Sequence, residues 1–358
     1  MKRWAAIARF GGIGDNLVAG APLYALKKMG YMTEVLTSEP NHVVFLNNPH
    51  VDKLTIHTPD RDFPQGDLLA WQKYFEGRAR TYDVFGHLSH SMEGRHAIFE
   101  TMTAFWWPED YRREICAGSY LETAMKIMRV PAPYEFDKLY YPTDEEIERA
   151  NRTKEELGGK FISWVINGSR IDKVYVQAPI LIPRIIKELG VPVVMHGAGE
   201  KEYSMAFAIQ EQVRVQNSST WGIVSAISKE GTEPSGHQNW PLRRSLALAS
   251  VADLVVSPDT GVAWSVAMND QPKIILVSHT SVENITKHWR NTVTMHADPD
   301  RVPCWPCHRL HNTPDTCVPN EFGNGAKCMT DISVEALFQQ IKASLNPSSN
   351  VLQFKAAS

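Results

Sequence analysis

Residues 249–264 have the sequence ASVADLVVSPDTGVAW, in which helical, extended and turn-forming character follow one another. Residues 242–251 space their apolar side chains as a helix does, and residues 254–257 form an apolar run that predicts a buried strand. The Asp-Thr-Gly sequence at 259–261 supplies turn residues directly after that strand. This order of helix, strand and glycine turn is typical of a parallel sheet covered by helices, so the predicted fold class is α/β.

The same alternation extends outward in both directions. In the second half we expect strands at 161–166, 191–196, 223–226, 254–257 and 273–277, with helices at 178–189, 202–213, 242–251 and 333–344. In the first half we expect strands at 4–8, 34–37, 51–56 and 84–88, and one helix over 16–29. Two successive series of this kind predict two Rossmann-like domains. The charged helix at 144–157 carries the chain between them, which divides it into 1–155, 156–345 and a tail at 346–358.

Length and composition narrow the class of protein. A chain of 358 residues exceeds the usual size of one hydrophobic core. A net charge of −3 without a long Lys/Arg block argues against broad binding to nucleic acid and favours small-molecule chemistry. The sequence contains no run of about 18 apolar residues, so no membrane span is predicted. The opening apolar run is broken by Arg9 and Asp15, so no signal peptide is predicted. We therefore expect a cytoplasmic protein.

The first glycine loop, RFGGIGDN at 9–16, lies where a strand leads into a helix. Gly12 and Gly14 allow close approach of the backbone to a ligand, although their spacing is not that of a dinucleotide fingerprint. A carboxylate at a helix start, Asp15, can act as a general base toward an acceptor hydroxyl. The alternative is that Asp15 only caps the helix.

A second loop, NGSRIDK at 167–173, follows another predicted strand. The hydroxyl of Ser169, the guanidinium of Arg170 and the ammonium of Lys173 together suit a diphosphate. Cations at such a position would stabilise a leaving nucleoside diphosphate without a catalytic metal. A solvated helix start that carries surface cations is the alternative.

Two further turns end predicted strands of the second half. HGAGE at 196–200 would shape a nucleoside pocket through Gly197 and Glu200, unless it is a simple tight turn. In the 259–261 turn, Asp259 would orient donor hydroxyls, unless it forms an Asx turn that caps the next helix. The residues that would present a hydroxyl and amides to the diphosphate are Thr260, Gly261 and Val262.

Four of the five cysteines fall between positions 304 and 328. Cys304 and Cys307 form a C-x-x-C pair, and Cys317 and Cys328 follow after nine and ten intervening residues. Four thiolates so close in sequence suit one tetrahedral ion, zinc by default. Such a closed site would be structural and would stabilise the segment before the last helix. Buried free thiols or a redox pair are the alternatives.

The order of these motifs resembles glycosyltransferase family 9, which contains the ADP-heptose:lipopolysaccharide heptosyltransferases. The resemblance covers the 9–17 loop, PLYALK at 22–27, NPHVD at 48–52, the 167–173 loop, the 249–264 stretch and the cysteine region. It implies the GT-B architecture, two Rossmann-like domains that face a central cleft, with the acceptor on the first domain and the nucleotide sugar on the second. It also implies that Asp15 is the catalytic base and that Lys173 contacts donor phosphate.

The resemblance further implies an inverting transfer, without a catalytic cofactor, of heptose from ADP-heptose to a lipopolysaccharide core or another glycan. The autotransporter heptosyltransferases resemble this plan with a cysteine-bound iron finger, so iron joins zinc as the expected ion. Ala263 and Trp264 stand where heptosyltransferases commonly have a histidine, and His279 follows the next strand. Other nucleotide sugars, a protein or modified-DNA acceptor, and a non-catalytic sugar-binding module therefore stay open. A lipid-linked acceptor, peripheral contact with the inner face of the membrane and a homo-oligomer stay open too.

Overall fold

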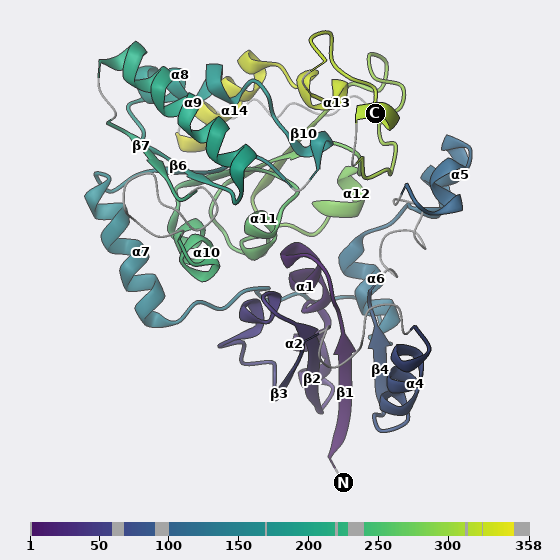
Figure 1. Cartoon of the computed structure of the whole chain (residues 1–358). Coiled ribbons are helices and arrows are strands. Elements are labelled where there is room, and N and C mark those ends of the chain that lie inside the picture. Colours follow the sequence, from purple (N-terminus) through teal and green to yellow (C-terminus); the bar gives the residue numbers. More distant parts are fainter. Residues whose placement is uncertain are drawn as a thin grey trace.

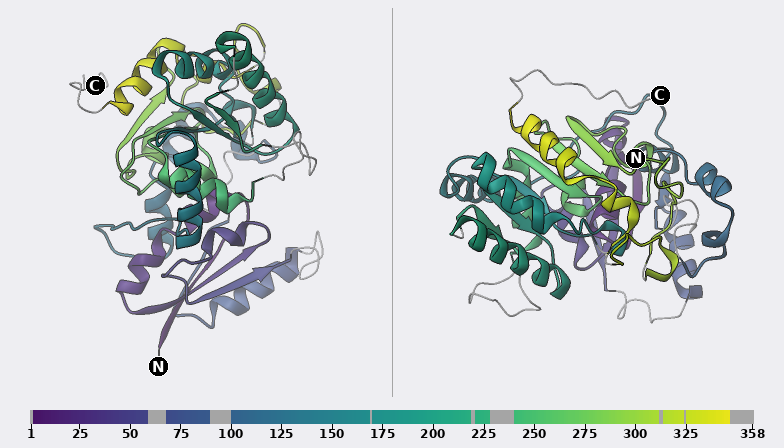
Figure 2. Two further views of the ribbon diagram at one scale, coloured as in Figure 1. Left: turned by 90° about the vertical axis from the view of Figure 1, so that its left-hand side faces the viewer. Right: turned by 90° about the horizontal axis from the view of Figure 1, so that it is seen from above.

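The computed structural model of the chain describes residues 2–58, 68–89, 100–168, 170–218, 221–227, 240–311, 314–323 and 325–346. These residues form two parallel sheets, one from each half of the chain, stacked with helices between them (Figure 1). The N-terminus and the C-terminal helix α14 lie at opposite ends of the molecule (Figure 2).

The first sheet has the strand order β3-β2-β1-β4, and all its strands are parallel. Its strands are β1 (Arg3–Ala8), β2 (Tyr31–Ser38), β3 (Lys53–His57) and β4 (Val84–His87). The helices and turns of this half are α1 (Ile13–Ala19), α2 (Pro22–Lys28), η1 (Asn41–Phe45), α4 (Leu68–Ala79), η2 (Thr103–Trp106), α5 (Glu109–Ile115), α6 (Tyr120–Ile127) and α7 (Asp144–Glu156).

The second sheet has the order β10-β9-β8-β5-β6-β7 and is also parallel throughout. Its strands are β5 (Ile162–Val165), β6 (Val193–His196), β7 (Ile223–Ser225), β8 (Leu254–Pro258), β9 (Lys273–Val277) and β10 (Thr292–His296). Its helices and turns are η3 (Ile171–Lys173), α8 (Ala178–Leu189), α9 (Glu200–Asn217), α10 (Leu242–Val251), α11 (Gly261–Ser265), α12 (Val282–Ile285), η4 (Pro314–Thr316), α13 (Lys327–Thr330) and α14 (Val334–Leu345). This strand order is that of a Rossmann sheet. Successive strands are added toward one edge from β5 to β7 and toward the other edge from β8 to β10, so the order reverses between β5 and β8.

All nine predicted strands are present, and β10 is an additional one. The single helix expected over 16–29 is wrong, because the chain forms α1 and α2 with a break at Gly20 and Ala21. Pro22 occupies the first turn of α2, where its missing N–H costs nothing. The early start of α1 at Ile13 places Asp15 in its first turn.

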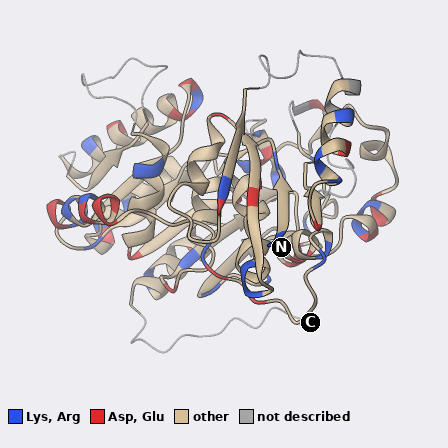
Figure 3. Cartoon of the chain, turned by 90° about the horizontal axis from the view of Figure 1, so that it is seen from below, with Lys and Arg blue, Asp and Glu red and all other residues tan. Residues whose placement is uncertain are grey.

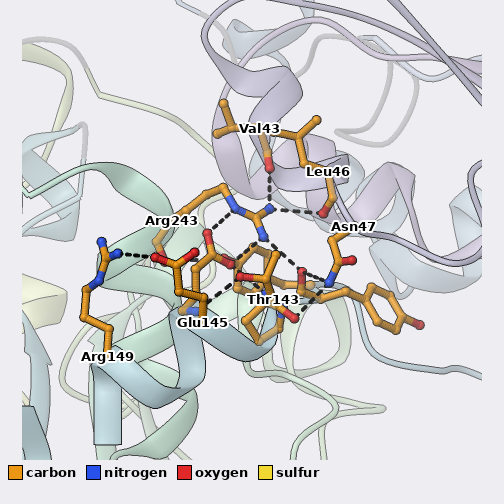
Figure 4. Close-up of polar contacts among 11 residues, drawn as sticks. Val43, Leu46, Asn47, Thr143, Glu145, Arg149 and Arg243 are labelled. Carbon is orange, nitrogen blue, oxygen red and sulfur yellow. Dashed lines mark hydrogen bonds and ion pairs between the residues drawn. The ribbon is translucent and has the colours of Figure 1, made fainter. Parts of the chain in front are cut away.

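The two halves share a hydrophobic cluster, beside other clusters that belong to one half. Leu17 and Leu121 of the first half and Trp264 and Trp289 of the second belong to a single buried cluster. Arg243 of α10 adds a polar clamp, since its guanidinium donates to the carbonyls of Val43 and Leu46 in the first half (Figure 4).

Arg243 also pairs with Glu146 of α7, with Nε 2.6 Å from Oε1. Helix α7, which the sequence-based division assigns to the first domain, packs against α10 of the second sheet. The division at residue 155 stays a prediction.

The segment that contains Cys304 and Cys307 is fastened to α5. Arg112 is fully buried and donates hydrogen bonds to the carbonyls of Cys307 and His308 as well as to those of Ala104 and Phe105. A planar guanidinium with several fixed donors suits this role. A helix from the first half of the sequence therefore holds the cysteine segment in place.

Charged residues of both signs are interspersed on the helices, as the view from below shows (Figure 3). Within the described part of the chain, no helix has the length and apolar character needed to cross a membrane.

Candidate active site

A cavity of about 670 Å³ lies between the two halves of the chain. Its walls come from the loops that follow β1, β5, β6 and β8, so they lie at the carboxyl ends of parallel strands. In open α/β sheets this is where ligands bind, close to the point where the strand order reverses. The site residues expected from the sequence that line the cavity are Gly12, Gly14, Asp15, Lys173, Gly197, Asp259, Thr260, Gly261 and Val262.

Among the described residues of the first half, Asp15 is the acidic one that lines this cavity. Its Oδ1 lies 2.9 Å from Nη2 of Arg9, and its Oδ2 accepts a hydrogen bond of 2.9 Å from the backbone N–H of Gly12. Arg9 is buried, whereas the Asp15 side chain is 42% exposed. Asp15 thus caps its own helix while its carboxylate stays accessible to a ligand, so the two roles weighed from the sequence are compatible.

Lys173 and Asp259 form an ion pair on the opposite wall. The ammonium Nζ of Lys173 lies 3.0 Å from both Oδ2 and the backbone carbonyl oxygen of Asp259, and each side chain is only 13% exposed. Burial alone lowers the pKa of Lys173, but the carboxylates of Asp259 and Asp172 outweigh it and raise that pKa. Burial raises the pKa of Asp259, but the charge of Lys173 outweighs it, and the net shift is downward. Both groups are therefore charged at neutral pH.

Trp264, one of the departures noted in the sequence, completes this wall. Its indole Nε1 donates to Oδ1 of Asp259 at 2.8 Å, so Lys173 and Trp264 each bind one carboxylate oxygen. The other departure, His279, lies elsewhere, because its Nδ1 is 2.9 Å from Oδ2 of the buried Asp172. Burial would raise the pKa of Asp172, but its interactions with His279, Lys173 and His311 together outweigh burial and lower that pKa to about 2.

Three expected site residues are not seen in the cavity wall. Arg170 and Glu200 are described but do not line the cavity, and Ser169 lies outside the described residues. Glu202, two positions after Glu200, lines the cavity instead. Because α9 begins at Glu200, a residue in its first turn can point back over the end of β6, and the HGAGE pattern by itself did not indicate which acidic residue would do so.

The structure adds wall residues to which the sequence analysis assigned no role: Asn41, Tyr120, Asn167, His196, Trp240 and Ser245. The one sequence indication available for two of them was position, since Asn167 and His196 end or follow predicted strands. His196 is buried, and among the described residues neither of its ring nitrogens has a hydrogen-bond partner. Burial lowers its pKa to about 4, so the imidazole is neutral at physiological pH.

The four clustered cysteines are free and partly buried. Burial raises the pKa of the Cys328 thiol, and the charges of Cys304, Cys307 and Cys317 raise it further, so the four sulfurs share one neighbourhood. His311 is near, with Nε2 3.7 Å from Sγ of Cys307. Among the described residues, however, no three Cys, His, Asp or Glu side chains are grouped as a metal site. The four-cysteine metal site stays a prediction.

No protein-family model matches the chain, and no curated protein matches its sequence. Solved structures do match it. A glycosyltransferase family 9 protein from Veillonella parvula is 12% identical, with 97% of this chain and 99% of that chain covered and a TM-score of 0.65. The ADP-heptose lipopolysaccharide heptosyltransferase II of Escherichia coli is also 12% identical, with 98% and 100% covered and a TM-score of 0.62.

A third match is the iron-containing, dodecameric heptosyltransferase TibC of enterotoxigenic Escherichia coli, in complex with ADP-D-β-D-heptose. It is 13% identical, with 97% of this chain and 78% of that chain covered and a TM-score of 0.53. At such low identities these likenesses establish the fold. The predicted GT-B architecture, two Rossmann-like domains that face a cleft, is confirmed.

Proposed function

We propose that this chain is an inverting glycosyltransferase that moves a sugar from a nucleoside-diphosphate sugar to a hydroxyl group. The observation that carries the proposal is that Asp15 of the first half and Lys173 of the second line the same cavity. A single displacement of a diphosphate by a neutral hydroxyl requires two groups. An accessible carboxylate takes the hydroxyl proton, and a cation on the opposite side stabilises the leaving diphosphate.

In this mechanism the acceptor oxygen attacks the anomeric carbon from the face opposite the diphosphate, which inverts the configuration. Asp15 takes the hydroxyl proton, with its carboxylate held by Arg9 and the Gly12 N–H. As the bond between the anomeric carbon and the phosphate oxygen breaks, negative charge grows on the nucleoside diphosphate. Lys173 stabilises that charge, and the turn at Thr260 and Gly261 holds the phosphates.

We infer that ADP-heptose is the donor and that a lipopolysaccharide core or another glycan is the acceptor. The donor inference is supported by the sequence motifs and by the similar structures named for ADP-heptose. Another nucleotide sugar, or a lipid-linked, protein or modified-DNA acceptor, would use the same two groups with a different pocket. The nucleoside would extend from the diphosphate site toward Gly197 and Glu202, because those residues line the adjoining wall.

The experiment is a native mass-spectrometric screen of ADP-heptose against ADP-, GDP-, UDP- and CDP-sugars, followed by turnover assays with Asp15→Asn. We expect selective binding of ADP-heptose, and we expect Asp15→Asn to lose at least a hundredfold in turnover while it keeps donor affinity. Preference for another nucleotide would overturn the donor but not the reaction class. Unchanged turnover in Asp15→Asn would remove Asp15 as the base, and absence of any donor binding would favour a non-catalytic protein.

We also propose that Cys304, Cys307, Cys317 and Cys328 bind one structural zinc or iron ion. Their shared neighbourhood and the preference of both metals for thiolates support this, and TibC is named as iron-containing. The ion would hold the segment before α14 and take no part in the transfer. We expect about one ion per chain in elemental analysis, lost in Cys317→Ser and Cys328→Ser but kept in Cys116→Ser, whose buried thiol lies outside the cluster. Protein purified without metal would contradict it.

A cytoplasmic location remains a prediction, and contact with the inner face of the membrane and a homo-oligomeric state stay open beside it. Sedimentation of the full chain, with and without lipid vesicles, tests the last two. A monomer that does not sediment with vesicles would contradict them.

A further inference from the structure

Asp259 is shared between two side chains of the cavity wall. Its Oδ2 and backbone carbonyl oxygen each lie 3.0 Å from Nζ of Lys173, and its Oδ1 accepts from Nε1 of Trp264 at 2.8 Å. An ammonium group has three N–H donors. Two of those of Lys173 are therefore bound to Asp259, and the third has no partner among the described residues, so it can donate to a ligand in the cavity.

The direction in which the Asp259 carboxylate points matters for an anionic ligand. Two like unit charges 4 Å apart repel strongly in the partly shielded interior of a protein. A carboxylate turned toward the cavity would repel a diphosphate. A carboxylate held between an indole N–H and an ammonium repels it less, because these two donors compensate its negative charge. The hydrogen bond from Trp264 thus keeps one oxygen of Asp259 on the indole and the other on Lys173.

Trp264 is itself immobilised by packing. It is 3% exposed, and its ring meets that of Trp289 at a centroid distance of 4.7 Å and an angle of 69°. Gly14 also lies against it, since a Cβ at position 14 would come within 3.0 Å of Cδ1 of Trp264. The indole N–H is therefore a fixed donor between the loop that carries Asp15 and the loop that carries Asp259.

We propose that Trp264 is a positioning residue that acts through Asp259 to hold the Lys173 ammonium in place for the diphosphate of the donor. The inference rests on the proposed function, because it assumes that a nucleoside diphosphate occupies this cavity. Trp264 forms its bond with Asp259 and needs no direct contact with the phosphates.

The test is a double-mutant cycle with ADP as the ligand, read by calorimetry on the full chain with Trp264→Phe, Asp259→Asn and the double variant. Phenylalanine keeps an aromatic ring in the packed site but has no N–H. Loss of a hydrogen bond to a charged group predicts an increase in Kd of about ten- to a hundredfold for Trp264→Phe. In the Asp259→Asn background the same replacement should have little further effect, since residues that act as a unit are not additive. In turnover assays, KM for the donor should rise more than kcat falls.

Trp305→Phe is the matched control. It also removes a buried indole N–H that has no hydrogen-bond partner among the described residues, but Trp305 belongs to a separate cluster and does not line the cavity, so ADP affinity should stay within about twofold. If Trp264→Phe does not fold, benzothienylalanine at 264 replaces the N–H by sulfur with almost the same shape, and the prediction for it is the same.

Two results would overturn the inference while leaving the proposed function intact. In one, the wild type binds ADP and Trp264→Phe binds it equally well, or Trp305→Phe weakens binding as much. In the other, the effects of Trp264→Phe and Asp259→Asn add in full. A wild-type chain that binds no nucleoside diphosphate would overturn the proposed function together with this inference.

Discussion

Gly261 at the start of α11 lies directly against Ile13 at the start of α1. A Cβ at position 261 would come within 2.5 Å of Cγ2 of Ile13, a separation that real Cβ atoms do not show. The first loop of one half and the Asp259 turn of the other meet here, so this glycine sets how closely Asp15 and Lys173 approach each other across the cavity.

Gly261→Ala should force α1 and α11 apart. Overpacking of this kind costs about 1–3 kcal/mol, so we expect a lower free energy of unfolding and weaker ADP binding. Chemical denaturation and calorimetry measure the two effects. Ile13→Ala in the same chain should restore part of the binding, because it removes Cγ2 but keeps the Cβ of residue 13, which would lie 2.8 Å away. Gly77→Ala is the control, because a Cβ there meets nothing within 4 Å, and binding that fell equally in it would contradict the steric account.

Arg243→Ala should weaken the junction between the halves. The Arg243 side chain is 13% exposed and that of Glu146 22% exposed, and Arg243 also donates to the carbonyls of Val43 and Leu46. Removal of one partner from a largely buried pair costs about 3 kcal/mol. Urea denaturation measures the loss. In Arg149→Ala, which breaks an exposed pair with Glu145 on the same helix, the change should stay within about 0.5 kcal/mol. Equal losses in both variants would show that the buried clamp has no special role.

Lys173→Met should raise the Kd for ADP by about ten- to a hundredfold, because it removes a charged donor and leaves Asp259 without its cation. The pKa of Lys173 is raised above its ordinary value. The side chain therefore stays a charged ammonium at every pH below that raised pKa and loses its proton only when the pH rises through it. Wild-type affinity should accordingly stay flat from about pH 7 to 9. Lys187→Met, on an exposed face of α8, serves as the control. A Kd for Lys173→Met equal to that of the wild type would exclude the phosphate contact.

His196→Met should make the protein less sensitive to acid. Burial lowers the pKa of His196 to about 4, against about 6.5 in an unfolded chain. The folded state therefore binds fewer protons between these values, so stability is complete above pH 6.5 and falls as the pH drops. Between pH 7.5 and 5 the wild type should lose about 2 kcal/mol more than His196→Met. Denaturation curves at both pH values give the loss of stability of each protein. The other buried histidines contribute equally to both losses, so they cancel when the two proteins are compared. Parallel losses would contradict the assignment.

Elements whose pattern is local were predictable from the sequence. The apolar runs that became β1, β5 and β8 and the glycine turns after them depend on neighbours a few positions away, so nine strands and the approximate place of the cavity were predicted. The break between α1 and α2 was missed, because the apolar spacing that continues over 16–29 was followed although Pro22 favours the first turn of a new helix over a helix interior. Strand β10 was missed as well, since its residues are only partly buried.

Contacts between distant positions were beyond the reach of such patterns. That Glu202 and not Glu200 lines the cavity depends on where α9 begins. That Arg112 holds the cysteine segment depends on a separation of 195 residues along the chain. Neither contact produces a periodic pattern in the sequence. A buried guanidinium or carboxylate needs a hydrogen-bonding partner, but the sequence does not specify which residue that partner is.

The sequence alone determined the α/β class, the two successive Rossmann series and the loops that carry Asp15, Lys173 and Asp259, since hydrophobic periodicity and turn chemistry are properties of short segments. Only the tertiary structure decided that these loops face one another, that Trp264 binds the oxygen of Asp259 that Lys173 leaves free, and that Gly261 rests on Ile13. Those relationships follow from how two sheets pack through a shared core, and packing depends on the shapes of residues that lie far apart in the chain.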